Sequence, residues 1–360
     1  MKGIIPAEIE AEPAAIRSTL AESLEAARAA ASALRQGGVR RIHVIGNGTS
    51  YHSSLAAATL YRRHARPDDP VVVPLTAGEF LTYPPLLGDG DAVLGISASG
   101  EFRDVVAVVE GLRGRIPTVA VVHVPGSTLD GLADHVVRSS GGPSHVPVMT
   151  KTFAATLVAT ELVLAELLGG ERADAIRRSI GLAADHAEEA IEAAGLRVEA
   201  LADALAGAAH LFVVGSGGAY PAALEAALKL KEMAIVHAEG TESWEMASGV
   251  ATIVDADSVV IALAPDGPGR PSTTDVAAHA AGWGARVIEV APRSAIEGAS
   301  LLPIPAAAEE DHAALMTVPP VALLAFALAQ RRGHDPDHPG WVERYHSQGL
   351  RHIVGVEEET

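Results

Sequence analysis

Short apolar runs rich in β-branched residues alternate along the chain with Ala-rich amphipathic stretches. Such apolar runs predict strands that are buried on both faces. In the first half of the chain they are "IHVIG" (42–46), "VVVPL" (71–75), "AVLGIS" (92–97) and "TVAVVHV" (118–124). Helical periodicity marks the stretches between them, for example "YHSSLAAATLYRRH" and "RDVVAVVEGLR". The alternation predicts an α/β fold with a parallel sheet and crossover helices.

The strand and helix pattern occurs twice. The segment "RIHVIGNGTSYHSSLAAATL" (41–60) aligns without gaps with "HLFVVGSGGAYPAALEAALK" (210–229), 169 residues later. The similarity continues from 91–100 to 257–267 and from 115–127 to 284–294. Two similar subdomains are therefore expected, each a flavodoxin-like three-layer sandwich with helices on both faces of its sheet.

This duplication suggests a domain organisation. We expect an N-terminal helical segment over 1–35, a first subdomain over 36–170, connecting helices over 171–206, a second subdomain over 207–333 and a C-terminal tail over 334–360. The periodicity predicts long helices over 8–36 and 171–209. The stretch "VALLAFALA" (321–329) is too short to span a bilayer and predicts a buried helix.

Composition limits the kind of partner. Apolar residues make up 48% of the chain, and 27 Lys and Arg face 45 Asp and Glu, a net charge of −18. So acidic a chain is poorly suited to nucleic acid, and an anionic substrate would need backbone N–H groups and hydroxyls. There is no cysteine and no apolar signal segment at the N-terminus. We expect a soluble cytoplasmic protein without membrane contact.

Two loops that follow predicted strands carry candidate anion ligands. In "GNGTSY" (46–51), Gly48, Thr49 and Ser50 open a helix, where N–H groups and hydroxyls suit an anion. Tyr51 replaces the third glycine of a dinucleotide fingerprint, and no Walker lysine is present.

The second loop, "SASGEF" (97–102), offers the hydroxyls of Ser97 and Ser99 and free N–H groups around Gly100. Each loop alone could be a simple capped turn. Their positions at the carboxyl ends of neighbouring parallel strands favour a phosphate site.

The second copy carries different chemistry. Glu225, Lys229 and Glu232 lie at i, i+4 and i+7 on one helix face. They could form a solvated salt-bridge ladder or the edge of an active site. The first copy has Ala56, Leu60 and Arg63 at these positions, so we expect the first half to hold phosphate and the second to perform chemistry.

Other polar clusters have simpler explanations. The stretch "HAEGTESWEMASG" (237–249) fits no zinc spacing, and "HDPDHP" (334–339) is typical of turns. His237 is interpreted as a satisfied buried histidine. No metal and no cofactor are predicted.

Taken in order, "EIEAEPAAIRSTL", "GNGTSYHSSLAA", "SASGE", "VPGSTL", "TKTFAATL", "YPAALEAALKLKE" and "VHAE" resemble the double sugar-isomerase (SIS) domain proteins. The chain is similar to the isomerase part of glucosamine-6-phosphate synthase and to related deaminases and deglycases. The resemblance implies that Thr49, Ser50, Ser97 and Ser99 bind a sugar 6-phosphate. It implies that Glu232 moves a proton between C1 and C2, supported by Glu225 and Lys229, in a homodimer with active sites near the subunit boundary.

The chain also departs from the synthase. Phe102 stands where the phosphate loop usually has a hydroxyl, with Arg103 beside it as a possible replacement. Ser248 occupies the place of the ring-opening histidine. The lysines are at 2, 151, 229 and 231, so the tail lacks the imine-forming lysine.

Other residues are candidates for the missing roles. A gap-free alignment puts Arg344 in place of the tail lysine, and two residues of slack put His346 there. We expect His346 to act as an acid or base. Glu242, Glu245 and Ser248 are candidates for the histidine's role. No glutaminase domain precedes the repeats and the chain has no cysteine, so we do not expect glutamine to supply ammonia.

Removal of the C2 proton by Glu232 is the activity that requires the fewest of the residues missing from this chain. We favour elimination from an N-acetylhexosamine 6-phosphate, because it needs no lysine imine. A deaminating isomerase or deglycase acting on glucosamine 6-phosphate is the alternative. A non-catalytic sugar-phosphate sensor is a third, although no DNA-binding helix-turn-helix segment is evident.

Overall fold

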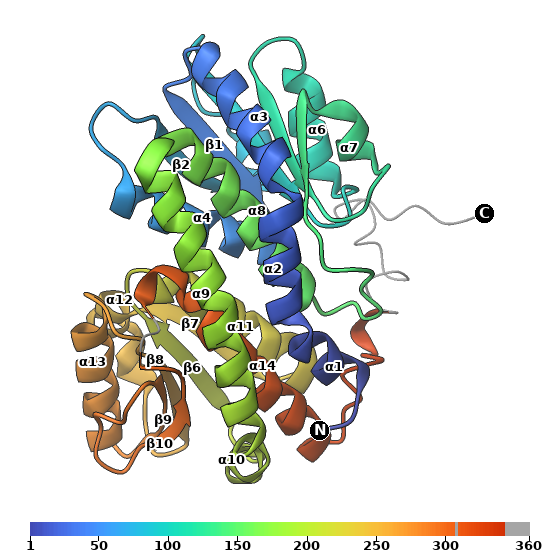
Figure 1. Ribbon diagram of the computed structural model, residues 1–360. Helices are drawn as coiled ribbons and strands as arrows, with labels where there is room; N and C mark the ends of the chain where they lie inside the picture. The colour runs from blue at the N-terminus through green and yellow to red at the C-terminus, as the bar shows by residue number, and fades with distance from the viewer. Residues whose placement is uncertain (307–308, 343–360) are drawn as a thin grey trace. The chain divides into compact units, whose positions relative to one another are not determined.

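The computed structural model describes residues 1–306 and 309–342, and the chain divides into two compact units (Figure 1). The first lobe comprises Ala14–Pro143, Lys151–Gly181 and the described residues from Gly340. The second lobe comprises Met1–Pro13, Ser144–Thr150 and Leu182–Pro339. Each lobe contains one parallel sheet.

The first-lobe sheet has the strand order β2-β1-β3-β4-β5, and all its pairs are parallel. Its strands are β1 (Arg41–Gly46), β2 (Val71–Thr76), β3 (Asp91–Ser97), β4 (Thr118–Val122) and β5 (His135–Arg138). Every residue of β3 and β4 is buried, as the apolar runs predict. Parallel strands covered on both faces need apolar side chains in both directions, which explains the missing polar alternation.

Helices cover both faces of this sheet. Ile45, Val93 and Ala120 pack with α5 (Ala77–Thr82), α6 (Arg103–Leu112) and α7 (Thr128–Leu132) in one buried cluster. The other helical layer contains α3 (Leu24–Gln36), α4 (Thr49–His64) and α8 (Lys151–Leu168), in which α8 packs against both others. α3 buries Ala27, Ala30, Ala31 and Leu34, a stripe with helical spacing.

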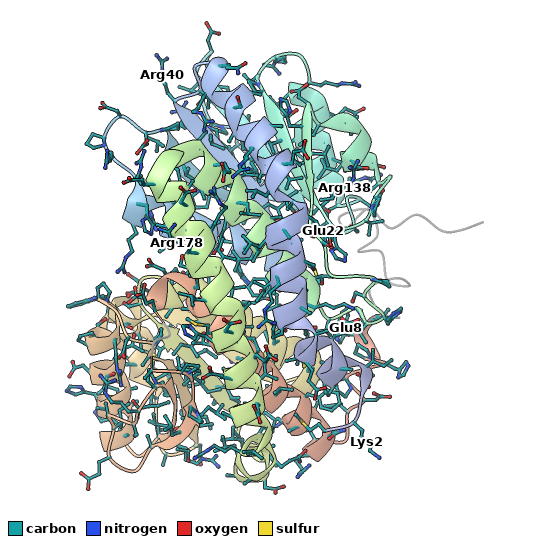
Figure 2. All side chains as sticks on the ribbon, viewed as in Figure 1. Lys2, Glu8, Glu22, Arg40, Arg138 and Arg178 are labelled. Atoms are coloured by element: carbon teal, nitrogen blue, oxygen red, sulfur yellow. The ribbon has the colours of Figure 1, made fainter. Side chains whose placement is uncertain are left out.

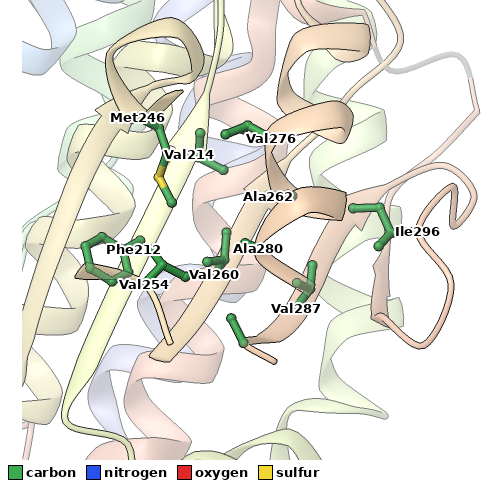
Figure 3. Close-up of a cluster of buried hydrophobic side chains, with 12 residues drawn as sticks. Phe212, Val214, Met246, Val254, Val260, Ala262, Val276, Ala280, Val287 and Ile296 are labelled. Carbon is green, nitrogen blue, oxygen red and sulfur yellow. The ribbon is translucent and has the colours of Figure 1, made fainter. Parts of the chain in front are cut away.

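The second-lobe sheet has the order β10-β9-β8-β6-β7. Its strands are β6 (His210–Gly215), β7 (His237–Glu242), β8 (Ser258–Leu263), β9 (Arg286–Ala291) and β10 (Ser300–Pro303). On one face, α12 (Ser243–Ser248) and α13 (Arg270–Gly282) enclose a core of β-strand valines, Phe212 and Met246 (Figure 3). On the other, α11 (Ala219–Ala234) and α14 (Ala313–Arg331) lie side by side, and α10 (Val198–Leu205) packs against α14.

The two sheets share one topology. Counted from its first strand, each has the order second, first, third, fourth, fifth, typical of flavodoxin-like sheets. The duplication and the two-sandwich α/β fold expected from the sequence are therefore confirmed. Strand register refines the alignment of the two copies. Arg41 of β1 pairs with Asp91, and the equivalent His210 of β6 pairs with Ser258, so Asp91 corresponds to Ser258.

The long helices differ in detail from the expectation. The predicted helix over 8–36 is three helices, α1 (Ile4–Glu10), α2 (Glu12–Glu22) and α3. Pro13 lies in the first turn of α2, where its missing N–H costs nothing. The stretch 171–209 contains α9 (Gly170–Gly195) and α10.

α14 confirms the buried helix predicted from "VALLAFALA". Among the described residues, 310–331 form the single helical stretch long and apolar enough to cross a membrane. Its most apolar window is wholly buried within the protein, as in the core helix of a soluble protein.

Gly100 is required at the turn after β3, and its replacement tests this turn. Its φ of +71° is left-handed, and a Cβ there would lie 2.0 Å from Ser127 Oγ. We expect Gly100→Ala to lower the free energy of unfolding by about 2 kcal/mol or more in urea denaturation. The control is Gly111→Ala in α6, where a Cβ meets nothing within 4 Å. Gly111→Ala should raise the free energy of unfolding by about 0.5–1 kcal/mol. Equal effects of the two substitutions would contradict the steric argument.

Candidate functional site

The two predicted anion loops lie together in the first lobe. β1 ends at Gly46 and β3 at Ser97, and the two strands are neighbours in the sheet. Asn47 of the first loop donates a side-chain hydrogen bond to the carboxylate of Asp104, in the first turn of α6. This bond joins the loop before α4 to the first turn of α6.

Hydroxyls and helix N-termini converge at this edge. Thr49 and Ser50 are buried in the first turn of α4, which follows the positive-φ Gly48. Ser97 Oγ accepts the Gly100 N–H at 3.0 Å, and Ser99 Oγ accepts the Glu101 N–H at 3.2 Å. The expectation of free N–H groups around Gly100 is therefore wrong for these two groups. The two serine oxygens lie 3.5 Å apart. Hydroxyls beside two helix starts are suited to a phosphate, because the N–H groups and helix dipoles there favour anions.

Arg103 and Ser127 flank these hydroxyls. Arg103 is the exposed first residue of α6, after Phe102. Ser127 precedes α7, and within the described residues its buried Oγ has no hydrogen-bond partner. A Cβ on Gly100 would overlap this oxygen, so Ser127 adjoins the loop. Sequence reasoning missed it, although "VPGSTL" belonged to the resembling motifs.

The charged triad of the second lobe is a buried ion-pair cluster. Lys229 Nζ lies 3.0 Å from Glu225 Oε1 and 2.7 Å from Glu232 Oε2. The side chains of Glu225 and Lys229 are 0% and 1% exposed, whereas that of Glu232 is 22% exposed. A solvated salt-bridge ladder is therefore excluded. Glu232 is the member that solvent, and hence a substrate, can reach.

Burial and charge act against each other at Lys229. Desolvation lowers the pKa of this lysine, but the carboxylates of Glu225 and Glu232 outweigh it and raise the pKa to about 12. Lys229 is therefore an ammonium at neutral pH. Its ammonium group lies 2.7 Å from Glu232 Oε2 and balances the charge of that carboxylate.

The N-terminal helices add two carboxyl groups that sequence reasoning missed. Glu12 is buried, and its charge interacts with those of Lys229, Glu225 and Glu8. Desolvation raises the pKa of Glu12 well above its usual value, and Glu225 and Glu8 act in the same direction against Lys229. Glu8, labelled on α1 in Figure 2, accepts the His145 N–H at 2.7 Å. The motif "EIEAEP" was visible, but it lies more than 200 residues from Lys229, so the sequence could not show the charge interaction between Glu12 and Lys229.

The remaining candidates lie around α12 and beyond. Glu242 begins α12 as its cap, accepting the N–H groups of Trp244 and Glu245. Glu245 is exposed, and the exposed Ser248 donates to the Trp244 carbonyl at 2.7 Å. His346 lies outside the described residues.

The structure also describes His237 and the acidic and histidine side chains that could bind a metal. The interpretation of His237 as a buried histidine is wrong, because it is exposed at the start of the edge strand β7 and contacts His210. Over 1–306 and 309–342, no group of three His, Asp or Glu side chains is placed to hold a metal ion.

A comparison with known families now places the chain. The model of the SIS domain matches residues 38–166 and 204–330, one segment for each sheet. The chain belongs to the SIS domain family. The resemblance inferred from the sequence motifs is thereby confirmed.

Curated relatives of this SIS protein include isomerizing glutamine–fructose-6-phosphate aminotransferases. The one from Gloeobacter violaceus is 33% identical over 347 residues, and the one from Methanothermobacter thermautotrophicus is 31% identical over 336. Each alignment covers 92% of this chain but only 56% and 55% of the relative. The SIS chain therefore spans about half the length of these relatives.

Solved structures confirm the fold. The C-terminal domain of glucosamine-fructose-6-phosphate aminotransferase from Francisella tularensis has a TM-score of 0.85 at 22% identity, covering 94% of this chain and 99% of its own. A glucosamine-6-phosphate deaminase from Thermotoga maritima has a TM-score of 0.71 at 19% identity, covering 91% and 97%.

Glu12 gives a stability prediction with a defined pH dependence. Because its folded pKa is raised, the group contributes stability at acid pH that is lost as pH rises from about 4.5 through the folded pKa. Glu12→Gln removes this loss. We expect it to raise the free energy of unfolding by about 1–3 kcal/mol at neutral pH and by little near pH 4.5, in urea titrations at both values.

Glu10→Gln, on the exposed side of α1, is the matched control and should change stability by less than about 0.5 kcal/mol. Equal destabilisation by Glu12→Gln at both pH values would mean that Glu12 is an ionised partner of Lys229 instead.

Proposed function

We propose that the protein is an enzyme that removes the C2 proton of a 2-amino- or 2-acetamido-hexose 6-phosphate, with Glu232 as the base. One observation carries this proposal: Glu232 is the accessible carboxylate of an otherwise buried cluster, held by Lys229 at 2.7 Å. A C2 proton beside a carbonyl is acidic enough for a positioned carboxylate to remove. Glu225 and Lys229 position Glu232 and balance its charge.

The substrate phosphate is assigned to the first lobe. The hydroxyls of Thr49, Ser50, Ser97 and Ser99 supply neutral donors. Ser97 Oγ and Ser99 Oγ each accept a backbone N–H within the loop, so each serine can direct its own hydroxyl hydrogen to a phosphate. Neutral donors suit a chain with a net charge of −18, because they need no basic field. Arg103 adds a positive charge at the start of α6.

Two of the four lysines are already bound within the protein, which favours elimination as the fate of the C2 carbanion. Lys229 is held between two carboxylates, and Lys151 Nζ donates to the Pro143 carbonyl at 2.7 Å. In the open-chain aldehyde, the C2–H electron pair would form a C2–C3 double bond while the C3 hydroxyl, taking up a proton, leaves as water. The product is a 2,3-unsaturated aldehyde, and no imine to a lysine is required.

A deaminating isomerase is the second candidate, and the relatives favour it. The aminotransferases are described as isomerizing, and one structural neighbour is a glucosamine-6-phosphate deaminase. With a free 2-amine, proton transfer from C2 to C1 would give a ketose imine, whose hydrolysis consumes water and releases ammonia. The nitrogen substituent therefore decides between the two outcomes.

Other assignments complete the proposal. His346, Glu245 and Ser248 are the candidates for opening the sugar ring and protonating the leaving oxygen. We expect a cytoplasmic homodimer with active sites near the subunit boundary.

The products distinguish the two reactions. We expect N-acetylglucosamine 6-phosphate to lose the mass of one water, followed by mass spectrometry, and glucosamine 6-phosphate to release little ammonia in a coupled assay. Ammonia and fructose 6-phosphate formed rapidly from the free amine would instead establish the deaminating isomerase.

Variants separate chemistry from phosphate binding. Glu232→Gln should lower kcat about 100- to 10,000-fold with little change in KM, because it removes a base but no binding group. Ser97→Ala combined with Ser99→Ala should mainly raise KM. Glu189→Gln, exposed on α9, is the control and should leave both unchanged. Saturable binding of hexose phosphates without any turnover, equal in wild type and Glu232→Gln, would indicate a sensor instead.

A further inference from the structure

Glu310 places a carboxylate between two helix starts of the second lobe. It lies in the short 3-10 helix η2 (Glu310–His312) before α14 and is 5% exposed. Its Oε1 accepts the Gly218 N–H at 3.0 Å, and its Oε2 accepts the Gly269 N–H at 2.6 Å. Gly218 directly precedes α11, and Gly269 directly precedes α13. Both carboxylate oxygens therefore neutralise the positive end of a long helix.

The internal repeat identifies the first-lobe residues that correspond to Gly218 and Gly269. Gly218 corresponds to Thr49, because β1 and β6 align at an offset of 169 residues. From the register of β3 and β8, Gly269 corresponds to Phe102, the residue before α6. The Glu310 carboxylate thus occupies, in the second lobe, the position between two helix starts that the proposed function assigns to phosphate in the first.

The glycines of the second lobe make room for this carboxylate. A Cβ would lie 1.7 Å from Glu310 Oε1 at Gly217 and 2.1 Å from the Glu310 carbonyl oxygen at Gly218. At Gly267, which corresponds to Gly100, it would lie 2.5 Å from the Glu310 Cβ. The first lobe has Thr49, with a hydroxyl side chain, at the place of Gly218.

The serine hydroxyls are also replaced. Ala264 and Asp266 correspond to Ser97 and Ser99 in the strand register. The Asp266 carboxylate pairs with Arg270 and with Arg293 at 3.3 Å. The second lobe therefore has the N–H groups of an anion site, an internal anion bound to them, and no serine hydroxyls of its own at these two positions.

We propose that Glu310 is an internal ligand that fills the anion site of the second lobe, so that a sugar phosphate binds only in the first. The comparison rests on the proposed function for the first-lobe site. The occupied site also links the starts of α11 and α13, and α11 carries Glu225, Lys229 and Glu232. The buried Glu310 thereby makes the two lobes differ in their ability to bind an anion from solution.

The test removes the internal ligand and offers inorganic phosphate. The parent protein carries Ser97→Ala and Ser99→Ala, so that first-lobe binding is weakened. In this parent, Glu310→Ala should create phosphate binding by calorimetry, at one per chain, and saturating phosphate should raise Tm by about 2–4 °C. Glu310→Gln fills the same space, and Glu309→Ala alters the exposed neighbour. Both should respond as the parent does.

A folded Glu310→Ala protein that takes up no phosphate beyond its parent would overturn the proposal. If Glu310→Ala does not fold in phosphate-free buffer, its refolding yield is measured with increasing phosphate, beside Glu310→Gln. Recovery by phosphate supports an anion site, and no recovery at any concentration refutes it. Failure of the proposed first-lobe site is a separate result, seen as no phosphate uptake by the wild-type chain.

Discussion

Both lobes must provide acceptors for the backbone N–H groups at the starts of two neighbouring helices. In each sheet, the first and third strands are neighbours, and the helices that follow them begin at the same carboxyl edge. The unpaired N–H groups and helix dipoles at this edge require acceptors. In the second lobe the protein supplies its own acceptor, Glu310. In the first lobe the corresponding edge is lined by serine and threonine hydroxyls.

A second constraint is the burial of charge on α11. Lys229 and Glu225 are removed from water, and such a pair is maintained only when good geometry compensates for desolvation. Glu232 shares the same ammonium but remains partly exposed. This arrangement joins a buried ion pair to one partly exposed carboxylate. The duplicated helix α4 of the first lobe has no comparable group, since Ala56, Leu60 and Arg63 occupy the three positions.

Glu12 extends this cluster to the N-terminal helices. A buried carboxyl with a raised pKa beside Lys229 and Glu225 costs stability at neutral pH. Natural sequences retain such costs chiefly where they serve a site. The N-terminal segment is therefore part of the electrostatic environment of Lys229 and Glu225, in addition to its packing role.

The sequence by itself determined the fold class, the duplication and the grouping of the hydroxyls in the loops after β1 and β3. Apolar runs and helical periodicity are local, and alternation of strands and helices indicates a parallel sheet, so these features need no knowledge of distant contacts. The i, i+4, i+7 spacing likewise placed Glu225, Lys229 and Glu232 on one face. It could not decide between a solvated ladder and a buried cluster, because burial depends on the packing around α11. Only the tertiary structure brought Glu12 to Lys229, placed Ser127 beside Gly100 and put the Glu310 carboxylate between α11 and α13. Each of these contacts joins residues far apart in the chain, and no local pattern encodes their distance.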